Sequence, residues 1–308
     1  LFRNYVARSV DHYKNRTTHY EILNEPLYTT YAVPARFGYG MKDYLDLLRI
    51  AYEAVKSQQL EAQVLGGLGA WVDSSWVRRF VNDGGLKWCD IMDIHLYPVT
   101  IPPEMYEQDL ASVWETMQAR GEAKPIWLTE FGCYADDDPY MTPSTIGDAA
   151  MSRAHWPTER AAAEALVKSS ACFLSHGVSK IFFHAGTCGP INGADGGGIF
   201  FEYGGAPRKM YAALSALANL LGEDFRALPP TVVTDRLRGY LFGTSRGVVA
   251  VVWAVGEEPV SLVLPASVGA LDLMGNPVQQ AAARVTSMPV YLTGQDGGAL
   301  RDLLERAK

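Results

Sequence analysis

The chain has 308 residues, a formal net charge of −7 and 48% hydrophobic residues, which is enough for a large core and more than one domain. The acidic balance, with no clustered stripe of Lys and Arg, argues against nucleic acid or an anionic membrane as the main partner. No apolar run reaches the ~18 residues that a membrane span requires, so no membrane segment is expected.

The cysteines and the N-terminus carry little functional signal. The four cysteines form no CxxC pair and the histidines are scattered, so free thiols are favoured over disulfides, and neither a metal site nor a cofactor is expected; the cysteines are Cys89, Cys133, Cys172 and Cys188. The sequence starts at Leu1 without a signal-peptide pattern. Localisation therefore stays open between a cytoplasmic and a secreted bacterial protein.

The first third of the chain alternates between predicted helices and strands. Residues 2–14 and 41–58 have apolar side chains at helical spacing, which predicts amphipathic helices. Between them, residues 20–26 form a short β-prone run that ends on the carboxylate Glu25 before a proline. Residues 62–68 predict the next strand, and the loop after it carries Trp71, a candidate for stacking on a sugar face or for packing.

Residues 86–98 contain a strand with an unusual polar side. Asp93, His95 and Tyr97 share one parity, and Ile94 and Leu96 share the other, so the polar set is expected to point inward. Polar side chains in a core each need a partner. We therefore predict a site role for His95 and Tyr97.

After a predicted helix over 103–120, residues 125–132 predict a buried strand that ends on Glu130. Alternation places Leu128 and Glu130 on the same side, with Leu128 filling a barrel interior and Glu130 at its rim. A carboxylate at the C-terminal end of a barrel strand is in the usual place for catalysis. The structural alternative is a carboxylate that caps the strand and pairs with a nearby Arg.

Further along, residues 134–156 predict a long loop that begins with Tyr134, a second candidate for sugar stacking. A helix over 158–176, with Thr158 as its N-cap, precedes a strand over 180–186 with His184 near its end. The glycine-rich segment 187–205 is expected to form a rim loop, and 207–221 is expected to form the last barrel helix.

After Gly222 the pattern changes to short strands separated by turn residues, which predicts a small β-sandwich. The predicted domains are 1–222 for the barrel part, 223–296 for the sandwich and 297–308 for a terminal helix.

The two carboxylate-ending strands lie about three βα units apart, at roughly 30–35 residues per unit. Asn24-Glu25-Pro26, followed by a strand that ends in Thr129-Glu130-Phe131-Gly132, resembles the clan A glycoside hydrolases, with xylosidase- and cellulase-like members of family 39 as the nearest group. The resemblance implies an α/β fold, a (β/α)8 TIM-type barrel of which strands four to eight are visible, together with a C-terminal β-sandwich.

The same resemblance implies a retaining glycosidase that acts on β-glycosidic bonds of oligo- or polysaccharides. Glu25 would be the acid/base and Glu130 the nucleophile, while Asn24 would bind the sugar 2-OH and Tyr97 would lie beside the nucleophile. The remaining expected substrate-binding residues are His95, Trp71, Tyr134 and His184. Many clan members have a Trp at the position of His184, so the sugar preference cannot be transferred.

Only five of eight barrel strands can be counted, so three βα units are expected to precede Leu1 in a longer protein, or another chain, in a homo-oligomer for example, would complete the barrel. The competing function is a non-catalytic carbohydrate-binding or scaffold protein on a degenerate barrel. The missing strands favour that alternative, and the intact Asn24, Glu25 and Glu130 oppose it.

Overall fold

The computed structural model describes residues 1–30, 32–33, 35–97, 102–133, 135, 137, 156–184, 200–201, 206–278 and 282–307. The chain forms two compact units. The first comprises Leu1–Leu96, Gln108–Phe131 and Gly177–Phe183, and the second comprises Tyr97–Glu107, Gly132–His176 and His184–Lys308. Each unit is described by itself.

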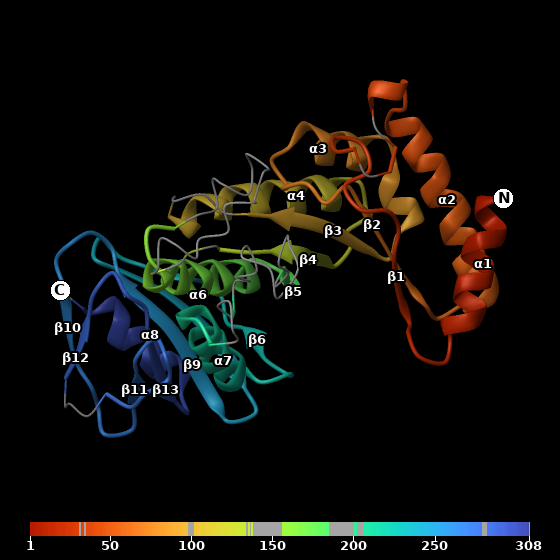
Figure 1. Ribbon diagram of the computed structural model, residues 1–308. Coiled ribbons are helices and arrows are strands. Elements are labelled where there is room, and N and C mark those ends of the chain that lie inside the picture. The colour runs from red at the N-terminus through yellow and green to blue at the C-terminus, as the bar shows by residue number, and fades with distance from the viewer. Residues whose placement is uncertain are drawn as a thin grey trace. The chain divides into compact units, whose positions relative to one another are not determined.

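The first unit is built on a five-stranded parallel sheet in the order β1-β2-β3-β4-β5 (Figure 1). The strands are β1 His19–Glu21, β2 Gln63–Gly67, β3 Ile91–Leu96, β4 Ile126–Phe131 and β5 Val178–Phe183. Each strand lies beside the next strand along the chain, as in a barrel built from successive βα units. All five carboxyl ends therefore meet at one edge of the sheet.

The helices of the first unit begin and end close to where the sequence predicts them. Helix α1 spans Phe2–Tyr13 and lies beside α2, Met41–Gln58 (Figure 1). Helix α4, Glu107–Ala119, follows a single 3₁₀ turn at Pro103–Tyr106. Helix α3, Ser75–Asn82, was not predicted. It begins where the Ser74 side chain accepts from the Trp76 N–H, an N-cap inside a stretch that reads as a loop.

Strand β4 does not keep the alternation that its sequence predicts. The Trp127 ring stacks on His19 of β1 with ring centroids 5.0 Å apart, although two strands separate β1 from β4. Such a contact requires a curved sheet with both rings on its concave face. Leu128 follows Trp127 in the strand, so its side chain points to the opposite face, where it is fully buried and pairs with Ile94. The prediction that Leu128 lines the barrel interior is therefore wrong.

A bulge explains how Glu130 nevertheless reaches the upper rim. The pairing of β3 with β4 shifts between Ile94 and His95, which places His95 opposite Glu130. The pairing of β4 with β5 is also irregular between Leu128 and Phe131. An extra residue in one strand breaks the period of two, so Glu130 is not tied to the side on which Leu128 lies.

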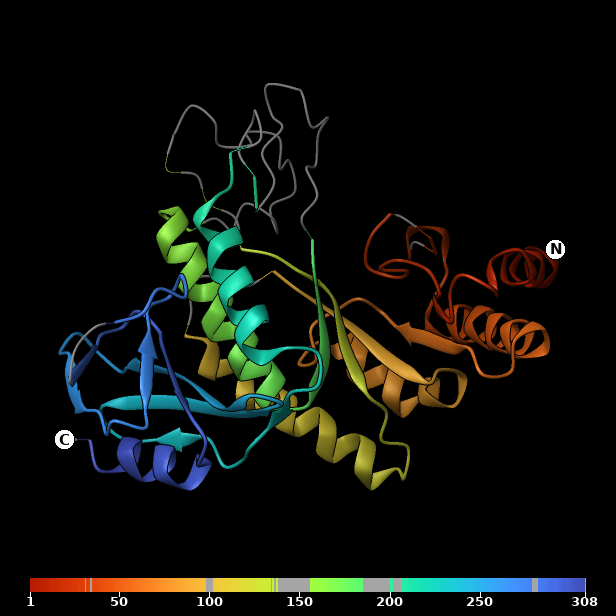
Figure 2. The ribbon, with the colours of Figure 1, turned by 90° about the horizontal axis from the view of Figure 1, so that it is seen from below.

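The second unit contains helices α6, Glu159–Ser175, and α7, Lys209–Leu221, which lie side by side (Figure 2). The Thr158 side chain accepts from the Ala161 N–H, so its predicted role as N-cap is confirmed. Helix α7 ends at Gly222, whose φ is 72°, a backbone conformation that favours glycine.

The C-terminal strands of this unit form two antiparallel sheets. The larger sheet contains β6 Arg226–Ala227, β7 Val232–Val233, β8 Leu237–Thr244, β9 Gly247–Ala254, β11 Gly269–Leu271 and β13 Val290–Gly294. The smaller sheet pairs β10, Val260–Val263, with β12, Ala282–Val285. Residues of both sheets and of α8, Gly297–Glu305, share one apolar core. A sandwich in the strict sense stays a prediction, as do the barrel positions four to eight.

Within the described ranges, none of the helices combines the length and the apolar character that a membrane crossing requires.

Candidate active site

Glu25 is positioned by a strained turn after β1. Leu23 and Glu25 have φ values of 68° and 43°, a left-handed conformation that side chains with a Cβ rarely adopt. Backbone strain of this kind persists where surrounding contacts enforce it, and it is concentrated at functional sites. Thr29 holds the turn from the other side, because its Oγ1 donates to the Glu25 carbonyl oxygen over 2.6 Å.

His95 brings the two predicted catalytic carboxylates together. Its Nδ1 atom lies 2.9 Å from Glu25 Oε1 and 3.6 Å from Glu130 Oε2. One carboxylate oxygen of Glu25 and one of Glu130 lie within 4.8 Å of each other. The side chains of Glu25 and Glu130 are 16% and 25% exposed, whereas His95 is only 3% exposed. The arrangement is two partly accessible acids that approach the same nitrogen of a buried imidazole.

Two further acids, Glu21 and Asp93, approach the same imidazole. Glu21 lies on β1, and Asp93 is buried on β3 beside His95. One ligand atom from each of Glu21, Asp93 and His95 lies within 4.8 Å of the others. The alternation of residues 93–97 predicted that Asp93 points inward, but neither Asp93 nor Glu21 was predicted as a site residue. Asp93 could have been found because it is two residues before His95 in the same strand and so points to the same side. The strand that contains Glu21 has only three residues, which is too short for such a pattern.

The charges of these acids change one another's protonation. Burial raises the pKa of Asp93 to about 6, against the opposing effect of the His95 charge. Although Glu21 exposes part of its surface, desolvation of its carboxyl and the charge of Asp93 raise its pKa to about 7. Burial by itself lowers the pKa of His95, but the Glu25 hydrogen bond and the charges of Glu130 and Asp93 outweigh it, and the net shift is upward.

Glycines after β2 make room for this cluster. A Cβ atom on Gly69 would lie 2.8 Å from His95 Cε1 and 3.0 Å from Glu25 Cγ, and Gly69 has a φ of +58°. Its N–H donates to Asp93 Oδ2 over 3.0 Å, and its carbonyl accepts from the Tyr28 hydroxyl. Burial and the nearby Glu25 charge raise the pKa of Tyr28, so this hydroxyl keeps its proton as a donor.

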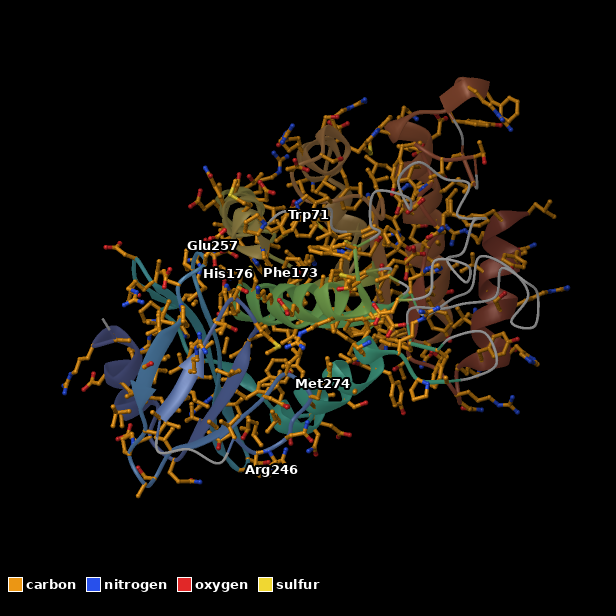
Figure 3. The ribbon with its side chains drawn as sticks, turned by 60° about the vertical axis from the view of Figure 1, so that its left-hand side comes forward. Trp71, Phe173, His176, Arg246, Glu257 and Met274 are labelled. Atoms are coloured by element: carbon orange, nitrogen blue, oxygen red, sulfur yellow. The ribbon has the colours of Figure 1, made fainter. Side chains whose placement is uncertain are left out.

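The other predicted site residues are placed less centrally. Asn24 is exposed in the turn that carries Glu25. The Trp71 indole N–H donates to Asp109 Oδ2 on α4 over 3.0 Å (Figure 3), so its ring is held by a structural hydrogen bond. Tyr97 and His184 belong to the second unit, where their rings meet edge to face with centroids 5.9 Å apart. Tyr134 lies outside the described residues.

A third cluster, Glu107, Cys172 and His176, lies in the second unit, with His176 near the end of α6 (Figure 3). Burial raises the pKa of the Cys172 thiol well above its usual range, and its Sγ lies 3.4 Å from the Pro103 carbonyl oxygen. A thiol that keeps its proton is a poor metal ligand. The Tyr240 hydroxyl donates to Glu107, so the cluster is a partly buried polar network.

Comparison with known proteins gives one family match for the sequence. Residues 46–170 match the family model described as glycosyl hydrolase catalytic core. None of the curated proteins matches the sequence. The match begins within α2, after Glu25, and includes Glu130.

Solved structures of glycoside hydrolases share the fold at low sequence identity. A GH30 endoxylanase from Clostridium papyrosolvens has a TM-score of 0.62 at 13% identity, over 96% of this chain and 70% of that one. A GH39 β-xylosidase from Caulobacter crescentus has a TM-score of 0.61 at 15% identity, over 96% and 72%. The GH39 enzyme from Xanthomonas axonopodis pv. citri has a TM-score of 0.59 at 15% identity, over 94% and 72%.

The predicted resemblance to clan A glycoside hydrolases is confirmed at the level of the fold, and enzymes of GH30 and GH39 are among the solved structures that share it. The TIM-barrel fold class and the predicted enzyme class, a glycosidase, are supported with it.

Proposed function

We propose that this protein is a retaining glycosidase that cleaves β-glycosidic bonds of oligo- or polysaccharides by double displacement, with Glu130 as nucleophile and Glu25 as acid/base. The observation that carries the proposal is the separation of the two acids, whose nearest oxygens lie within 4.8 Å about His95. Retaining enzymes hold the two carboxyl groups roughly 5–5.5 Å apart, whereas inverting enzymes need roughly 6.5–9.5 Å to admit a water molecule.

In the first step, a carboxylate oxygen of Glu130 attacks the anomeric carbon, and the glycosidic C–O bond breaks. The leaving oxygen takes the proton of Glu25, so the aglycone departs as an alcohol and a glycosyl ester forms on Glu130. In the second step, Glu25 removes a proton from water, the water oxygen attacks the anomeric carbon, and Glu130 is released as a carboxylate.

Glu25 must carry a proton in the first step, so a neighbouring group has to stabilise the protonated form of its carboxyl. The 2.9 Å contact between Glu25 and His95 Nδ1 allows one proton to be shared by the two side chains. The negative charge of Glu130 also favours a proton on either of them. Asn24 is proposed to hydrogen-bond the sugar 2-OH, and Tyr97 stays a proposed substrate-binding residue. His95, Trp71, Tyr134 and His184 complete the proposed substrate-binding set.

A panel of aryl β-glycosides tests the proposal. The parent is expected to hydrolyse at least one of them, and proton NMR of the first-formed sugar should show the β-anomer. Glu130→Ala should lose hydrolysis by several orders of magnitude and regain turnover with added azide, which replaces the missing nucleophile. The matched control is Glu61→Ala, because Glu61 is exposed and lies just before β2 begins, away from the carboxyl ends of the strands.

Three outcomes contradict the proposal. An α-anomer as first product would indicate inversion, and unchanged hydrolysis by Glu130→Ala would exclude it as the nucleophile. Oligosaccharide binding without turnover by the parent would select a non-catalytic carbohydrate-binding protein.

A further inference from the structure

Two pairs of carboxyl groups lie close to the imidazole of His95. Its Nδ1 atom faces Glu25 and Glu130 at 2.9 and 3.6 Å. Glu21 and Asp93 form the other pair, and one ligand atom of each lies within 4.8 Å of a His95 ring nitrogen and of the other acid. The proposed mechanism uses only the first pair. The second pair therefore needs its own explanation.

The second pair is held in place by the surrounding strands. Asp93 is 3% exposed, and its Oδ2 accepts the Gly69 N–H. A Cβ atom on Gly67 would lie 2.7 Å from Asp93 Oδ1, so only glycine leaves room for this carboxyl. Thr129 on β4 approaches Glu21 Oε1 with its hydroxyl at 3.5 Å. Glycines of β2 and of the residues after it, together with Thr129 of β4, thus surround the Glu21 and Asp93 carboxyls beside the imidazole.

The other nitrogen of His95 has an unusual environment. Nε2 is buried and has no hydrogen-bond partner among the residues that the structure describes. Burying a polar nitrogen without a partner costs free energy, and negative charges nearby can offset that cost when the ring carries a positive charge. The second pair supplies such charge.

The groups that face this cluster from other elements remain neutral. Tyr28, in the segment after β1, and Tyr44, on α2, both have pKa values raised by burial and by the neighbouring acids. The Cys89 thiol, before β3, is likewise held protonated by burial and by the Asp93 charge. Among the described residues, the charges of Glu25, Glu130 and Asp93 act on His95, and His95 and Glu21 also interact by charge.

On the basis of the proposed function, we infer that Asp93 and Glu21 are positioning residues whose negative charge retains a proton on the His95–Glu25 pair. Their charge grows as the pH rises through the neutral range. That is the range in which the shared proton would otherwise be lost, so the growing charge opposes its loss. The effect is to keep Glu25 able to act as an acid at higher pH than an isolated pair would allow.

A titration of the full chain labelled with ¹⁵N-histidine tests the inference, with His95→Gln used to assign the His95 signals. Asp93→Asn and Glu21→Gln each remove one negative charge with little change in shape. The pKa of His95 is expected to fall by about 1 pH unit in each variant. The basic limb of kcat/KM should move to lower pH in the same direction, whereas KM should change little.

The matched control is Asp90→Asn, which removes a carboxylate just before the same strand. Asp90 pairs with Lys56 at 2.9 Å and accepts the Val64 N–H, and neither group belongs to the cluster. Its variant should leave both the His95 titration and the pH profile unchanged. Unchanged signals from the other five histidines would establish that each variant is folded, and Glu21→Gln serves if Asp93→Asn does not fold.

An unchanged His95 titration in folded Asp93→Asn and Glu21→Gln would overturn the inference, as would a shifted titration without movement of the basic limb. A parent chain that hydrolyses no glycoside would instead defeat the proposed function. The titration separates the two failures, since it requires no substrate.

Discussion

The Nδ1 atom of His95 lies 2.9 Å from Oε1 of Glu25, between residues 70 positions apart in the chain. His95 is fixed within β3, whereas Glu25 follows β1 in a left-handed turn. The contact therefore joins the strained turn to the sheet, and it holds the Glu25 carboxyl near Glu130, the second-last residue of β4.

Replacement of this imidazole should weaken catalysis. In His95→Gln the ionisable ring is lost, and a hydrogen bond to a charged group contributes roughly 1.5–3 kcal/mol. We expect kcat/KM on an aryl glycoside to fall roughly 10- to 100-fold. The control His12→Gln changes an exposed residue of α1 and should retain the parent value. An undiminished kcat/KM in His95→Gln would contradict the assigned contact.

The need for glycine beside His95 can be tested by an alanine substitution, with a second glycine of similar backbone conformation as the control. Gly69 and Gly121 have φ values of +58° and +67°, but a Cβ on Gly69 would meet His95 and Glu25, whereas nothing lies within 4 Å of one on Gly121. Both alanine variants bear a left-handed cost of roughly 1–2 kcal/mol. Only Gly69→Ala should also lose kcat/KM. Equal losses in the urea midpoint and in activity for both variants would show that the steric contact is unimportant.

Asp93 should make stability depend on pH in an identifiable direction. Its pKa is raised to about 6 in the folded chain, against about 3.9 when unfolded. Between these values the folded chain holds a proton that the unfolded chain has lost, so this group's contribution to the free energy of unfolding falls as pH rises. Asparagine has no such proton. Scanning calorimetry should show the Tm of Asp93→Asn rising relative to the parent from pH ~4 to ~6.

The comparison for this measurement is Asp90→Asn, whose removed carboxylate pairs with Lys56 and whose relative Tm should not rise over the same range. A flat or falling difference for Asp93→Asn would argue that its carboxyl is not held protonated by burial.

The second unit depends on a buried ion pair. Arg208 Nη1 lies 2.7 Å from Glu159 Oε1, with side chains 1% and 3% exposed. Glu159→Gln would remove the negative charge that Glu159 places 2.7 Å from the buried Arg208 guanidinium, and we expect a loss of roughly 3–5 kcal/mol in the free energy of unfolding. Glu164→Gln, on the same helix, removes an acid that is 22% exposed and 3.7 Å from Arg160, and should cost at most about 1 kcal/mol. Urea unfolding followed by circular dichroism would show equal midpoints if the buried pair were unimportant.

Local patterns in the sequence predicted the elements well. The apolar spacing of residues 41–58 matches α2 at both ends, and the strand before Phe131 was found from its proline and glycine boundaries. Helical and strand periods are properties of neighbouring residues, so they can be recognised without knowing what the element packs against. The terminal carboxylates Glu25 and Glu130 were recognisable for the same reason.

The sequence thus determined a parallel sheet with two acids at its carboxyl edge and a short-stranded C-terminal part. Only the tertiary structure decided that β4 carries a bulge, that Glu25 takes a left-handed backbone, and that Glu21 and Asp93 join His95. These features depend on the register between strands and on burial from water, and both arise from contacts between segments far apart in the chain.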